Sequence, residues 1–241
     1  MKIALIGYGK MGKAIEKIAH ERNHIIVGKY GSENRPDAEE LKKADVAIEF
    51  SRPELAKGHI ALCREAGIPV VVGTTGWYEH FEDVKLLFQN EGALFTATNF
   101  SVGVNIAFHI NSILARIMNK NREYAAGITE IHHTQKLDAP SGTAISMAEG
   151  IIKEHLLFED WELSNDEKQS FGGKIPILAL REDQVPGTHT IQWNSAVDSI
   201  SITHVAHNRQ GFAMGATLAA EWIIGKQGVY SMKDMLNFES I

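Results

Sequence analysis

The first part of the chain alternates short apolar runs with longer segments whose apolar positions repeat at the helical period. The apolar runs have the length and composition of buried β-strands and cover residues 2–6, 25–29, 46–50, 70–72 and 93–96. The amphipathic segments between them predict helices over residues 11–22, 53–66 and 79–89. Regular alternation of this kind predicts a Rossmann-type α/β domain, in which helices cover both faces of a parallel sheet.

Beyond residue 104 the pattern changes to two helices and several separate strand-like runs. A long amphipathic helix starts near Val104, and its apolar face carries Ile106, Ile110, Ile113, Leu114 and Ile117. A second helix is predicted over residues 142–154, and strands are predicted over residues 124–131, 174–180, 189–194 and 199–205. These runs predict an α+β domain with an open mixed sheet, one face packed on the two helices and the other uncovered.

Two further segments complete the chain. Residues 158–171 are polar, acidic and weakly periodic, so we expect a helix end followed by a surface loop. Residues 211–224 are apolar almost all round and predict a buried helix that ends at Gly225. We expect the tail over residues 232–241 to pack on the first domain.

A glycine motif lies between the first predicted strand and the first predicted helix. Gly7, Gly9 and Gly12 have the Gly-x-Gly-x-x-Gly spacing, and a second strand follows, which is the context of a dinucleotide-binding fingerprint. Gly7 would make the tight turn, Gly9 would let a pyrophosphate approach the backbone, and Gly12 would let helix and strand pack closely. The predicted cofactor contacts in this motif are Gly7, Tyr8, Gly9, Lys10, Met11 and Gly12. The alternative interpretation is a tight turn with no ligand.

The end of the second predicted strand bears on which nicotinamide cofactor binds. An NAD site normally has an acidic residue there that binds the ribose 2′-hydroxyl, but here no carboxylate occurs before Glu33. Lys29, Ser32 and Arg35, with help from Lys10, could instead bind a 2′-phosphate. We therefore predict that NADPH is accepted and preferred, with NADH possible as well.

The ends of the third and fourth predicted strands should also line the cofactor groove. Ligands of parallel sheets bind beyond the carboxyl ends of the strands. Phe50 and Ser51 follow the third strand, and the loop Gly73-Thr74-Thr75 follows the fourth. The alternative interpretation of that loop is a polar turn.

The stretch over residues 130–144 collects the residues that can carry chemistry. It contains two adjacent imidazoles, His132 and His133, which can share a pocket only if the preceding strand ends there. Lys136 follows in a loop, where an ammonium can be both a charge partner and a proton donor. Ser141 can cap the next helix, whose first backbone N–H groups, at Gly142 and Thr143, should attract a carboxylate. Alternatively, the histidines are strand-end hydrogen bonders and the lysine is a solvated loop residue.

This stretch resembles a known signature. The run Glu-Ile-His-His-x-x-Lys-x-Asp-Ala-Pro-Ser-Gly-Thr-Ala is similar to that of the 4-hydroxy-tetrahydrodipicolinate reductases, formerly dihydrodipicolinate reductases, of bacterial lysine and diaminopimelate biosynthesis. The run Asn-Phe-Ser-Val-Gly-Val-Asn over residues 99–105 and the Gly-Thr-Thr-Gly loop over residues 73–76 also resemble that family. The match is long and spread over the chain.

The resemblance implies a reaction and roles for individual residues. The substrate would be a cyclic imine dicarboxylate, and a nicotinamide cofactor would supply the hydride. His132 would be an acid or an electrostatic stabiliser, and Lys136 would be the proton donor. The substrate carboxylates would be held by His133, Lys136, Gly142 and Thr143, and the cofactor would also contact Gly73, Thr74, Thr75, Ala97, Thr98, Asn99 and Phe100.

The resemblance also implies the domain organisation. The chain would return to its first domain, which makes a discontinuous dinucleotide-binding domain of residues 1–103 and 209–241. Residues 104–208 would form the substrate-binding and oligomerisation domain. In this family the open sheets stack, so we expect a homo-oligomer, namely a homotetramer.

Composition and charge narrow the classes of function. The formal net charge of −6 and the lack of any Lys/Arg run argue against a nucleic-acid surface. Cys63 is the only cysteine, so we expect no disulfide framework and no metal site. The chain opens directly on a strand and has no apolar run of membrane-spanning length, so we expect no signal peptide, no membrane partner and a cytoplasmic location.

Two rival functions stay open at this point. A related dehydrogenase could act on another oxo acid or semialdehyde, and the Asp-Ala-Pro-Ser-Gly-Thr turn is the feature that separates it from the reductase. A protein that senses dinucleotides without turnover would need a partner-binding or DNA-binding module. The acidic charge and the lack of a basic helix argue against such a module.

Overall fold

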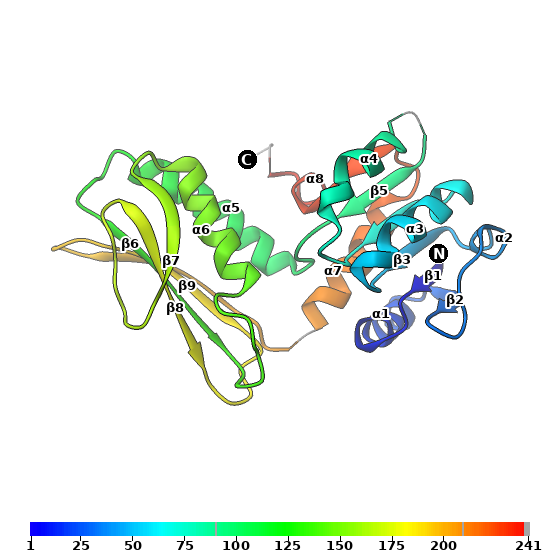
Figure 1. Ribbon diagram of the computed structural model, residues 1–241, viewed down its shortest axis with the longest axis horizontal. Coiled ribbons are helices and arrows are strands. Elements are labelled where there is room, and N and C mark those ends of the chain that lie inside the picture. The colour runs from blue at the N-terminus through cyan, green and yellow to red at the C-terminus, as the bar shows by residue number, and fades with distance from the viewer. Residues whose placement is uncertain (90, 209, 239–241) are drawn as a thin grey trace. The chain divides into compact units, whose positions relative to one another are not determined.

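The computed structural model describes residues 1–89, 91–208 and 210–238, and the chain divides into two compact units (Figure 1). Unit 1 comprises Met1–Val102 and Gln210–Ile241, and unit 2 comprises Gly103–Arg209. Each junction lies one residue from the boundary expected from the sequence. Residues 209 and 239–241, which belong to the expected final segment, lie outside the described residues.

Unit 1 contains a six-stranded parallel sheet in the order β11-β5-β4-β3-β1-β2. Its strands are β1 (Lys2–Ile6), β2 (Ile25–Tyr30), β3 (Val46–Glu49), β4 (Val70–Val72), β5 (Ala93–Thr96) and β11 (Gly228–Tyr230). The chain moves outward from β1 to β2 and then returns to β3 on the other side of β1. This topology confirms the predicted Rossmann-type domain and places its ligand crevice at the carboxyl ends of β1 and β3.

Helices cover both faces of this sheet. They are α1 (Lys10–Glu21), α2 (Ala38–Leu41), α3 (Pro53–Glu65), α4 (Phe81–Leu86), α7 (Gln210–Ile223) and α8 (Met232–Leu236), with a 3-10 turn, η1 (Tyr78–His80). One core lies under α1 and α7, and a second core lies under α3 and α4 on the opposite side of the strands. Cys63 is fully buried in the second core, in agreement with its helical spacing from Ile60.

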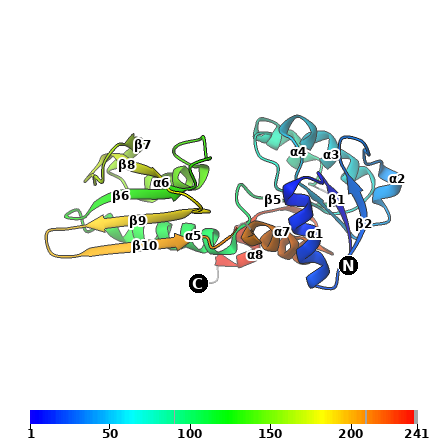
Figure 2. The ribbon, with the colours of Figure 1, turned by 90° about the horizontal axis from the view of Figure 1, so that it is seen from below.

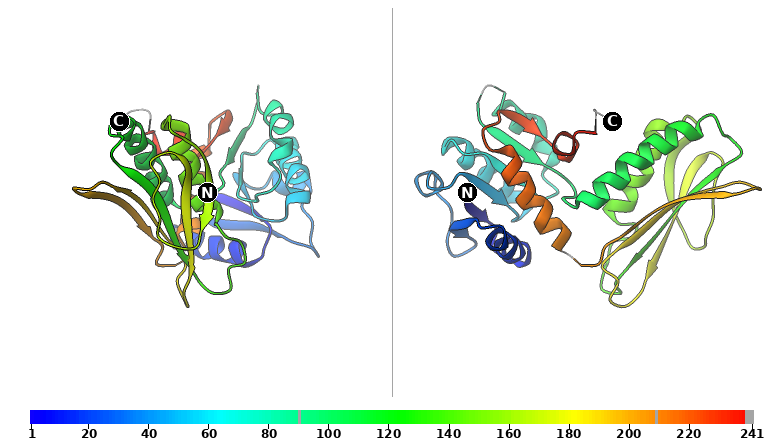
Figure 3. Two further views of the ribbon diagram at one scale, coloured as in Figure 1. Left: turned by 60° about the vertical axis from the view of Figure 1, so that its left-hand side comes forward. Right: turned by 180° about the vertical axis from the view of Figure 1, so that it is seen from behind.

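The C-terminal part of the chain returns to unit 1, where Figure 3 shows it in orange and red. Helix α7 is buried on most sides, as its apolar sequence predicts. A Cβ atom on Gly215 would lie 1.7 Å from the carbonyl oxygen of Phe100, so only glycine lets α7 approach this closely. The described part of the tail packs on the first core through Met232, Met235 and Leu236. Strand β11 pairs with β5 and has only three residues, too few to give a sequence pattern.

Unit 2 contains a five-stranded mixed sheet in the order β10-β9-β6-β8-β7 (Figure 2). Its elements are α5 (Val102–Met118), β6 (Ala125–His132), α6 (Gly142–Glu154), β7 (Phe158–Ser164), β8 (Gly173–Arg181), β9 (Thr188–Asn194) and β10 (Ser199–Val205). Strand β6 runs antiparallel to β9 and parallel to β8, which confirms a mixed sheet. Figure 2 shows α5 and α6 on one face of the sheet, and the core between helices and sheet includes Ile128, Ile191 and Trp193.

The segment over residues 158–171 is not the helix end and loop expected from its sequence. Its first half forms β7, an edge strand that pairs in parallel with β8. Phe158 is buried in the unit 2 core and Trp161 packs against that core, while the acidic residues between and beyond them are exposed. An edge strand keeps one face and one edge in water, so its sequence can be polar enough to conceal the period of two.

Of the apolar face predicted for the helix after Val104, Leu114 packs against the unit 2 core, but the four isoleucines do not. Helix α5 contacts the unit 2 core through the smaller Ala107 and Ala115, together with Met118. The outer side of the helix carries an isoleucine stripe that is 40% to 54% exposed, made of Ile106, Ile110, Ile113 and Ile117. Despite this stripe, the described part of the chain contains no helix with the length and apolar character that a bilayer span requires.

Candidate functional site

The end of β6 carries the acidic and imidazole side chains that the sequence singles out. Alternation along the strand puts Glu130 and His132 on the same side, where Glu130 is fully buried and His132 is 8% exposed. The strand ends at His132, so His133 lies just beyond it and is half-buried. The two adjacent imidazoles are therefore not forced to opposite faces of a continuing strand.

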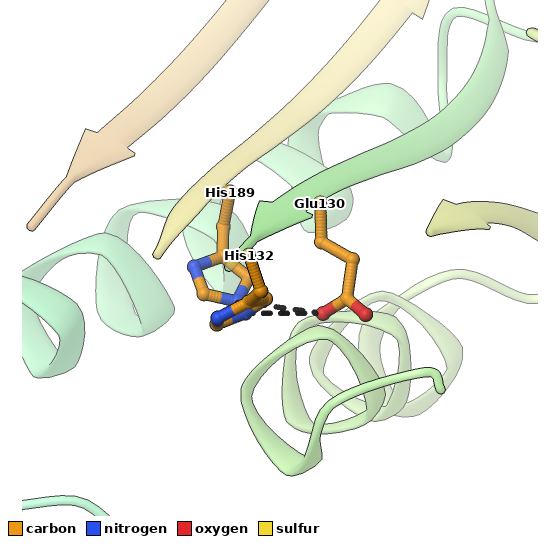
Figure 4. A group of neighbouring side chains, drawn as sticks. All are labelled: Glu130, His132 and His189. Atoms are coloured by element: carbon orange, nitrogen blue, oxygen red, sulfur yellow. Dashed lines mark hydrogen bonds and ion pairs between the residues drawn. The ribbon is translucent and has the colours of Figure 1, made fainter. Parts of the chain in front are cut away.

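His189 joins these two side chains from the neighbouring strand (Figure 4). It lies opposite Glu130 in the antiparallel pairing of β6 with β9 and is 4% exposed. Its Nε2 atom is 3.2 Å from Nε2 of His132, and Oε2 of Glu130 lies 3.5 Å from the His132 nitrogen and 3.6 Å from the His189 nitrogen. Sequence reasoning missed His189, although its alternation with Ile191 and Trp193 along β9 is a signal that it faces the core.

The turn before α6 ties the start of the helix to this cluster. The backbone N–H of Ser141 donates to both carboxylate oxygens of Glu130, at 3.0 and 3.1 Å. The Ser141 hydroxyl accepts a hydrogen bond from the N–H of Ala144 at 3.2 Å, which confirms the predicted N-cap, and lies 3.1 Å from Nε2 of His189. Helix α6 then begins at Gly142, and the backbone N–H groups of a helix start favour an anion.

Lys136 lies in the loop between β6 and α6, where an ion pair and a guanidinium fix its position. Its Nζ atom is 2.8 and 2.6 Å from the two carboxylate oxygens of Asp138. The hydrogen bond from Lys136 lowers the pKa of Asp138, so this carboxylate is ionised at neutral pH. Arg181 donates from Nε to the carbonyl oxygen of Lys136 at 3.2 Å and from Nη2 to that of Asp138 at 2.6 Å. The loop is thus fixed to the end of β8.

The charges of the cluster follow from its burial and its hydrogen bonds. Burial opposes the ionisation of Glu130, but hydrogen bonds from His132, His189 and Ser141 outweigh burial and lower the pKa of Glu130 far below its usual range. Burial lowers the pKa of His189, against the opposing effect of Glu130. Near neutral pH we therefore assign an anionic Glu130 and a neutral His189.

The same three side chains have a spacing that would also suit a metal ion. One ligand atom from each of Glu130, His132 and His189 lies within 4.8 Å of the others. The carboxylate, however, already accepts two bonds from the N–H of Ser141, and Nη1 of Arg181 lies 3.7 Å from its Oε1 atom. Protein groups therefore balance its charge, and we interpret the three side chains as a hydrogen-bonded cluster.

Unit 1 contains a pocket of about 930 Å³ at the carboxyl ends of β1 and β3. Its lining includes Gly7, Tyr8, Gly9, Ser32, Arg35, Phe50, Ser51, Arg52 and His59. Gly7 has a φ of +96°, and a Cβ atom there would lie 2.0 Å from the carbonyl oxygen of Phe50. A Cβ atom on Gly12 would lie 2.4 Å from the carbonyl oxygen of Gly7, whereas one on Gly9 would meet open space. The three glycines therefore fit the tight turn, the close packing and the open approach that a dinucleotide needs.

Both halves of the chain match models of one protein family. Residues 1–100 match the model described as dihydrodipicolinate reductase, N-terminus, and residues 103–236 match the one described as dihydrodipicolinate reductase, C-terminus. The chain belongs to the dihydrodipicolinate reductase family.

Individual relatives agree with this assignment. A 4-hydroxy-tetrahydrodipicolinate reductase of Christiangramia forsetii is 44% identical over 98% of this chain and 98% of the relative. One of Acinetobacter baylyi is 34% identical over 84% of this chain and 76% of the relative. The solved structure of dipicolinate-bound dihydrodipicolinate reductase from Paenisporosarcina sp. TG-14 shares the fold, with a TM-score of 0.78 and 24% identity over 96% of this chain and 97% of that chain.

Membership of the dihydrodipicolinate reductase family makes this chain an oxidoreductase of lysine and diaminopimelate biosynthesis that uses a nicotinamide cofactor. The predicted family and enzyme class are thereby confirmed. The rival interpretation as a sensing protein without turnover is not supported. The matched residues include the Asp-Ala-Pro-Ser-Gly-Thr turn that was expected to separate this family from dehydrogenases of other oxo acids.

The structure brings only some of the predicted cofactor residues to the pocket of this reductase. Lys29 is not among the lining residues, because its Nζ atom lies 2.5 Å from Oε1 of Glu16 and 5.0 Å from the centre of the Tyr8 ring. Ser32 and Arg35 do line the pocket. The cation that the loop after β2 presents to the pocket is therefore Arg35.

Ten other predicted contacts also fall outside the lining of this pocket, namely Lys10, Met11, Gly12, Gly73, Thr74, Thr75, Ala97, Thr98, Asn99 and Phe100. Two of them lie beside residues that do line it. A Cβ atom on Gly73 would lie 2.0 Å from the Phe50 ring, and Oγ1 of the buried Thr74 accepts a hydrogen bond from the N–H of Ser51 at 2.7 Å. Phe100 is 2% exposed and its ring lies 5.6 Å from that of Phe50.

Sequence reasoning also missed a buried acid beside the pocket. Glu49, the last residue of β3, is fully buried, and its Oε1 atom lies 3.2 Å from Nδ1 of His59 and accepts a hydrogen bond from the Ser51 hydroxyl. Glu49 thereby fixes two residues that line the pocket. A charged residue at the end of an otherwise apolar strand is the signal that could have identified it.

Proposed function

We propose that this chain reduces and dehydrates 4-hydroxy-tetrahydrodipicolinate to tetrahydrodipicolinate, with one hydride and one proton taken up and the 4-hydroxyl group lost as water. NADPH is the preferred cofactor and NADH a possible second one. The observation that carries the proposal is the arrangement of residues 130–144, where two imidazoles, an ammonium and a helix start lie within one short stretch. This arrangement suits a substrate that is anionic and takes up a proton. The two relatives described above carry the same activity in their names.

Each side chain of this stretch has a part in the proposal. Bound NADPH would supply the hydride, and charge would then develop on the ring nitrogen and the adjacent carbon of the substrate. Lys136 donates the proton from Nζ, and His132 acts as an acid or stabilises the developing charge. His133, Lys136, Gly142 and Thr143 hold the substrate carboxylates. A carboxylate that approaches Lys136 competes with Asp138, which pairs with the same ammonium.

We propose that one unit binds the cofactor and the other binds the substrate. Residues 1–103 and 209–241 bind the dinucleotide, and residues 104–208 bind the substrate and mediate oligomerisation. The glycine motif and its pocket support the first role, and the Glu130–Ala144 stretch supports the second. The cofactor would contact the glycine motif, Lys29, the Gly73-Thr74-Thr75 loop and the residues Ala97, Thr98, Asn99 and Phe100.

Arg35 and Ser32 at the pocket support the preference for NADPH, because a guanidinium and a hydroxyl can bind a 2′-phosphate. Initial rates with NADPH and NADH at matched concentrations test this preference. Faster turnover with NADPH is expected, and Arg35→Ala should remove the advantage without affecting the NADH rate. A strong preference for NADH in the unaltered enzyme would contradict the proposal.

A coupled assay tests the reaction itself. The absorbance of NADPH is followed while the freshly made product of dihydrodipicolinate synthase is added to the enzyme. We expect the absorbance to fall only when enzyme and that product are both present. Turnover of a different oxo acid or a semialdehyde, without turnover of this product, would show that the chain is a related dehydrogenase instead.

We also propose that the enzyme is a cytoplasmic homotetramer. The sheet of unit 2 has its helices on one face. Alternation with the core residue Ile177 along β8 puts Leu180 on the opposite face, and the pairing of Val205 with Thr188, next to the core-facing His189, puts Val205 there too. Leu180 is 36% exposed and Val205 is 50% exposed. Stacking of such faces would remove this surface from water. The pathway and the single, buried Cys63, which suits a reducing compartment, support the proposed cytoplasmic location.

A further inference from the structure

Glu130 carries its charge in the interior of unit 2, where an unbalanced charge would be costly. Its side chain has no exposed surface. The N–H of Ser141 donates to both of its oxygens, and the guanidinium of Arg181 lies 3.7 Å away. Hydrogen bonds from His132 and His189 also stabilise the carboxylate, and these same contacts can act on the two imidazoles.

The ring of His132 has one nitrogen inside the cluster and one outside it. Its Nε2 atom lies 3.5 Å from Oε2 of Glu130 and 3.2 Å from Nε2 of His189. Its Nδ1 atom is on the side of Gly187, where a Cβ atom would come within 3.3 Å of Nδ1 and 2.9 Å of Cε1. The missing side chain at Gly187 therefore leaves room for the ring in this orientation.

We propose that Glu130 is a positioning residue for His132. Its carboxylate binds Nε2 of the His132 ring, so that Nδ1 is the nitrogen that faces the substrate. His189 contacts the same Nε2 atom and keeps it inside the cluster. This inference rests on the proposed function, in which His132 is an acid or a stabiliser of charge. It adds two residues, Glu130 and His189, to the groups on which that function depends.

A carboxylate on one ring nitrogen controls the other nitrogen. By accepting the Nε2–H of His132, Glu130 fixes the rotation of the ring, so that Nδ1 is the nitrogen that can exchange a proton with the substrate. After Nδ1 gives up its proton, Nε2–H stays on Glu130 and the carboxylate remains ionised. The Nε2 atoms of His132 and His189 lie 3.2 Å apart, so only one of them can carry a hydrogen that points at the other. Nε2 of His189 instead forms a hydrogen bond with the Ser141 hydroxyl at 3.1 Å.

A simpler role for Glu130 would be to anchor the turn before α6. In that case the only function of Glu130 would be to bind the N–H of Ser141. Loss of Glu130 would then displace the start of α6, which is proposed to bind the substrate carboxylate. Such a change would raise the KM of the substrate. It would leave kcat and its dependence on pH as they are in the unaltered enzyme.

Glu130→Gln separates the two roles, because glutamine keeps an oxygen for the Ser141 N–H but removes the charge. We expect kcat to fall roughly tenfold or more, approaching the 10²–10⁴ that loss of the acid itself causes, with the KM for NADPH unchanged. Loss of a simple anchor would act on the substrate KM alone, so the separation of kcat from KM distinguishes the two roles. An unchanged kcat, with only the substrate KM raised, would overturn the proposal.

The matched control is Glu154→Gln. Glu154 ends α6 in the same unit, and its Oε2 atom is 3.0 Å from Nε of Arg116, so the change also removes one carboxylate from an ion pair. Its kcat should equal that of the unaltered enzyme. Neither variant replaces the charged groups around the cluster, which are Arg181 and the Lys136–Asp138 pair.

A measurement on the unaltered enzyme keeps the proposal testable if Glu130→Gln does not fold. Nitrogen NMR of enzyme labelled with ¹⁵N-histidine reports which ring nitrogen carries the proton, and His132→Gln identifies the His132 signals by their loss. We expect the neutral ring of His132 to be protonated at Nε2, and protonation at Nδ1 would overturn the proposal. If the unaltered enzyme lacks reductase activity, the proposed function fails, but this measurement still decides where the proton lies.

Discussion

Lys136 is the residue on which the proposed proton transfer depends. Lys136→Ala should lower kcat by roughly the 10²–10⁴ typical of a lost general acid. Steady-state kinetics of NADPH oxidation measure this loss. Lys168→Ala is the control, because Lys168 also pairs with an aspartate two residues away, Asp166 at 3.1 Å, on the surface of the same unit. Activity that survives nearly intact in Lys136→Ala would show that Lys136 is not the donor.

His189 should make the stability of the protein depend on pH. Burial lowers its pKa below the ordinary value of about 6.5. At mildly acidic pH the His189 side chain is therefore protonated in the unfolded chain but stays neutral in the folded chain. The free energy of unfolding should therefore fall as the pH drops below about 6.5, by at most ~1.4 kcal/mol per pH unit from this group. The lowered pKa of Glu130 adds a second loss of stability only below about pH 4.3.

Urea denaturation at neutral and mildly acidic pH measures this dependence. In His189→Asn the free energy of unfolding should fall less between the two conditions than in the unaltered protein, because the buried titrating group is gone. His20→Asn, at an exposed position of α1, should keep the dependence of the unaltered protein. Equal pH dependence in His189→Asn and the unaltered protein would show that His189 is not buried in its neutral form.

At the scale of elements, the close approach of α7 to the segment after β5 depends on one glycine. Gly215→Ala places a Cβ atom 1.7 Å from the carbonyl oxygen of Phe100, so the helix must shift, which typically costs about 1–3 kcal/mol of stability. Gly211→Ala on the same helix is the control. Its Cβ atom would meet Oγ and Cβ of Ser101 at 3.6 and 3.9 Å, which are ordinary contact distances, and alanine favours the helix by up to about 1 kcal/mol. The free energy of unfolding of each variant is measured by denaturant titration, and equal values for the two variants would contradict this account of the packing.

Elements whose pattern is local could be predicted from the sequence, and elements whose character depends on neighbours could not. The buried strands β1, β3, β4 and β5 and the Gly7–Gly12 turn show their patterns within a few residues. Strand β7 is polar because it lies at an edge, and the packing side of α5 is decided by which residues fit the sheet. His189 reaches Glu130 only through the register of β9 on β6, and Lys29 is held by Glu16 from another element.

At the scale of the whole molecule, two surfaces compete for the role of oligomer interface. One is the face of the unit 2 sheet opposite its helices, where Val205 lies on the edge strand β10. The other is the isoleucine stripe of α5, where Ile113 is 40% exposed. The proposed tetramer uses the sheet face, because the sheets of several copies can stack as layers with the helices of each molecule on the outside.

Light scattering of the purified enzyme should give a mass of roughly four times the 26.6 kDa of the chain. Val205→Glu places a carboxylate in the stacked face, where it would be buried without a partner, so the variant should dissociate into smaller species. Val27→Glu is the matched control, because Val27 is also a partly exposed valine on an edge strand, β2 of unit 1. If Ile113→Glu dissociates the assembly and Val205→Glu does not, the interface lies on α5 instead, and a monomeric unaltered enzyme would contradict the proposed assembly altogether.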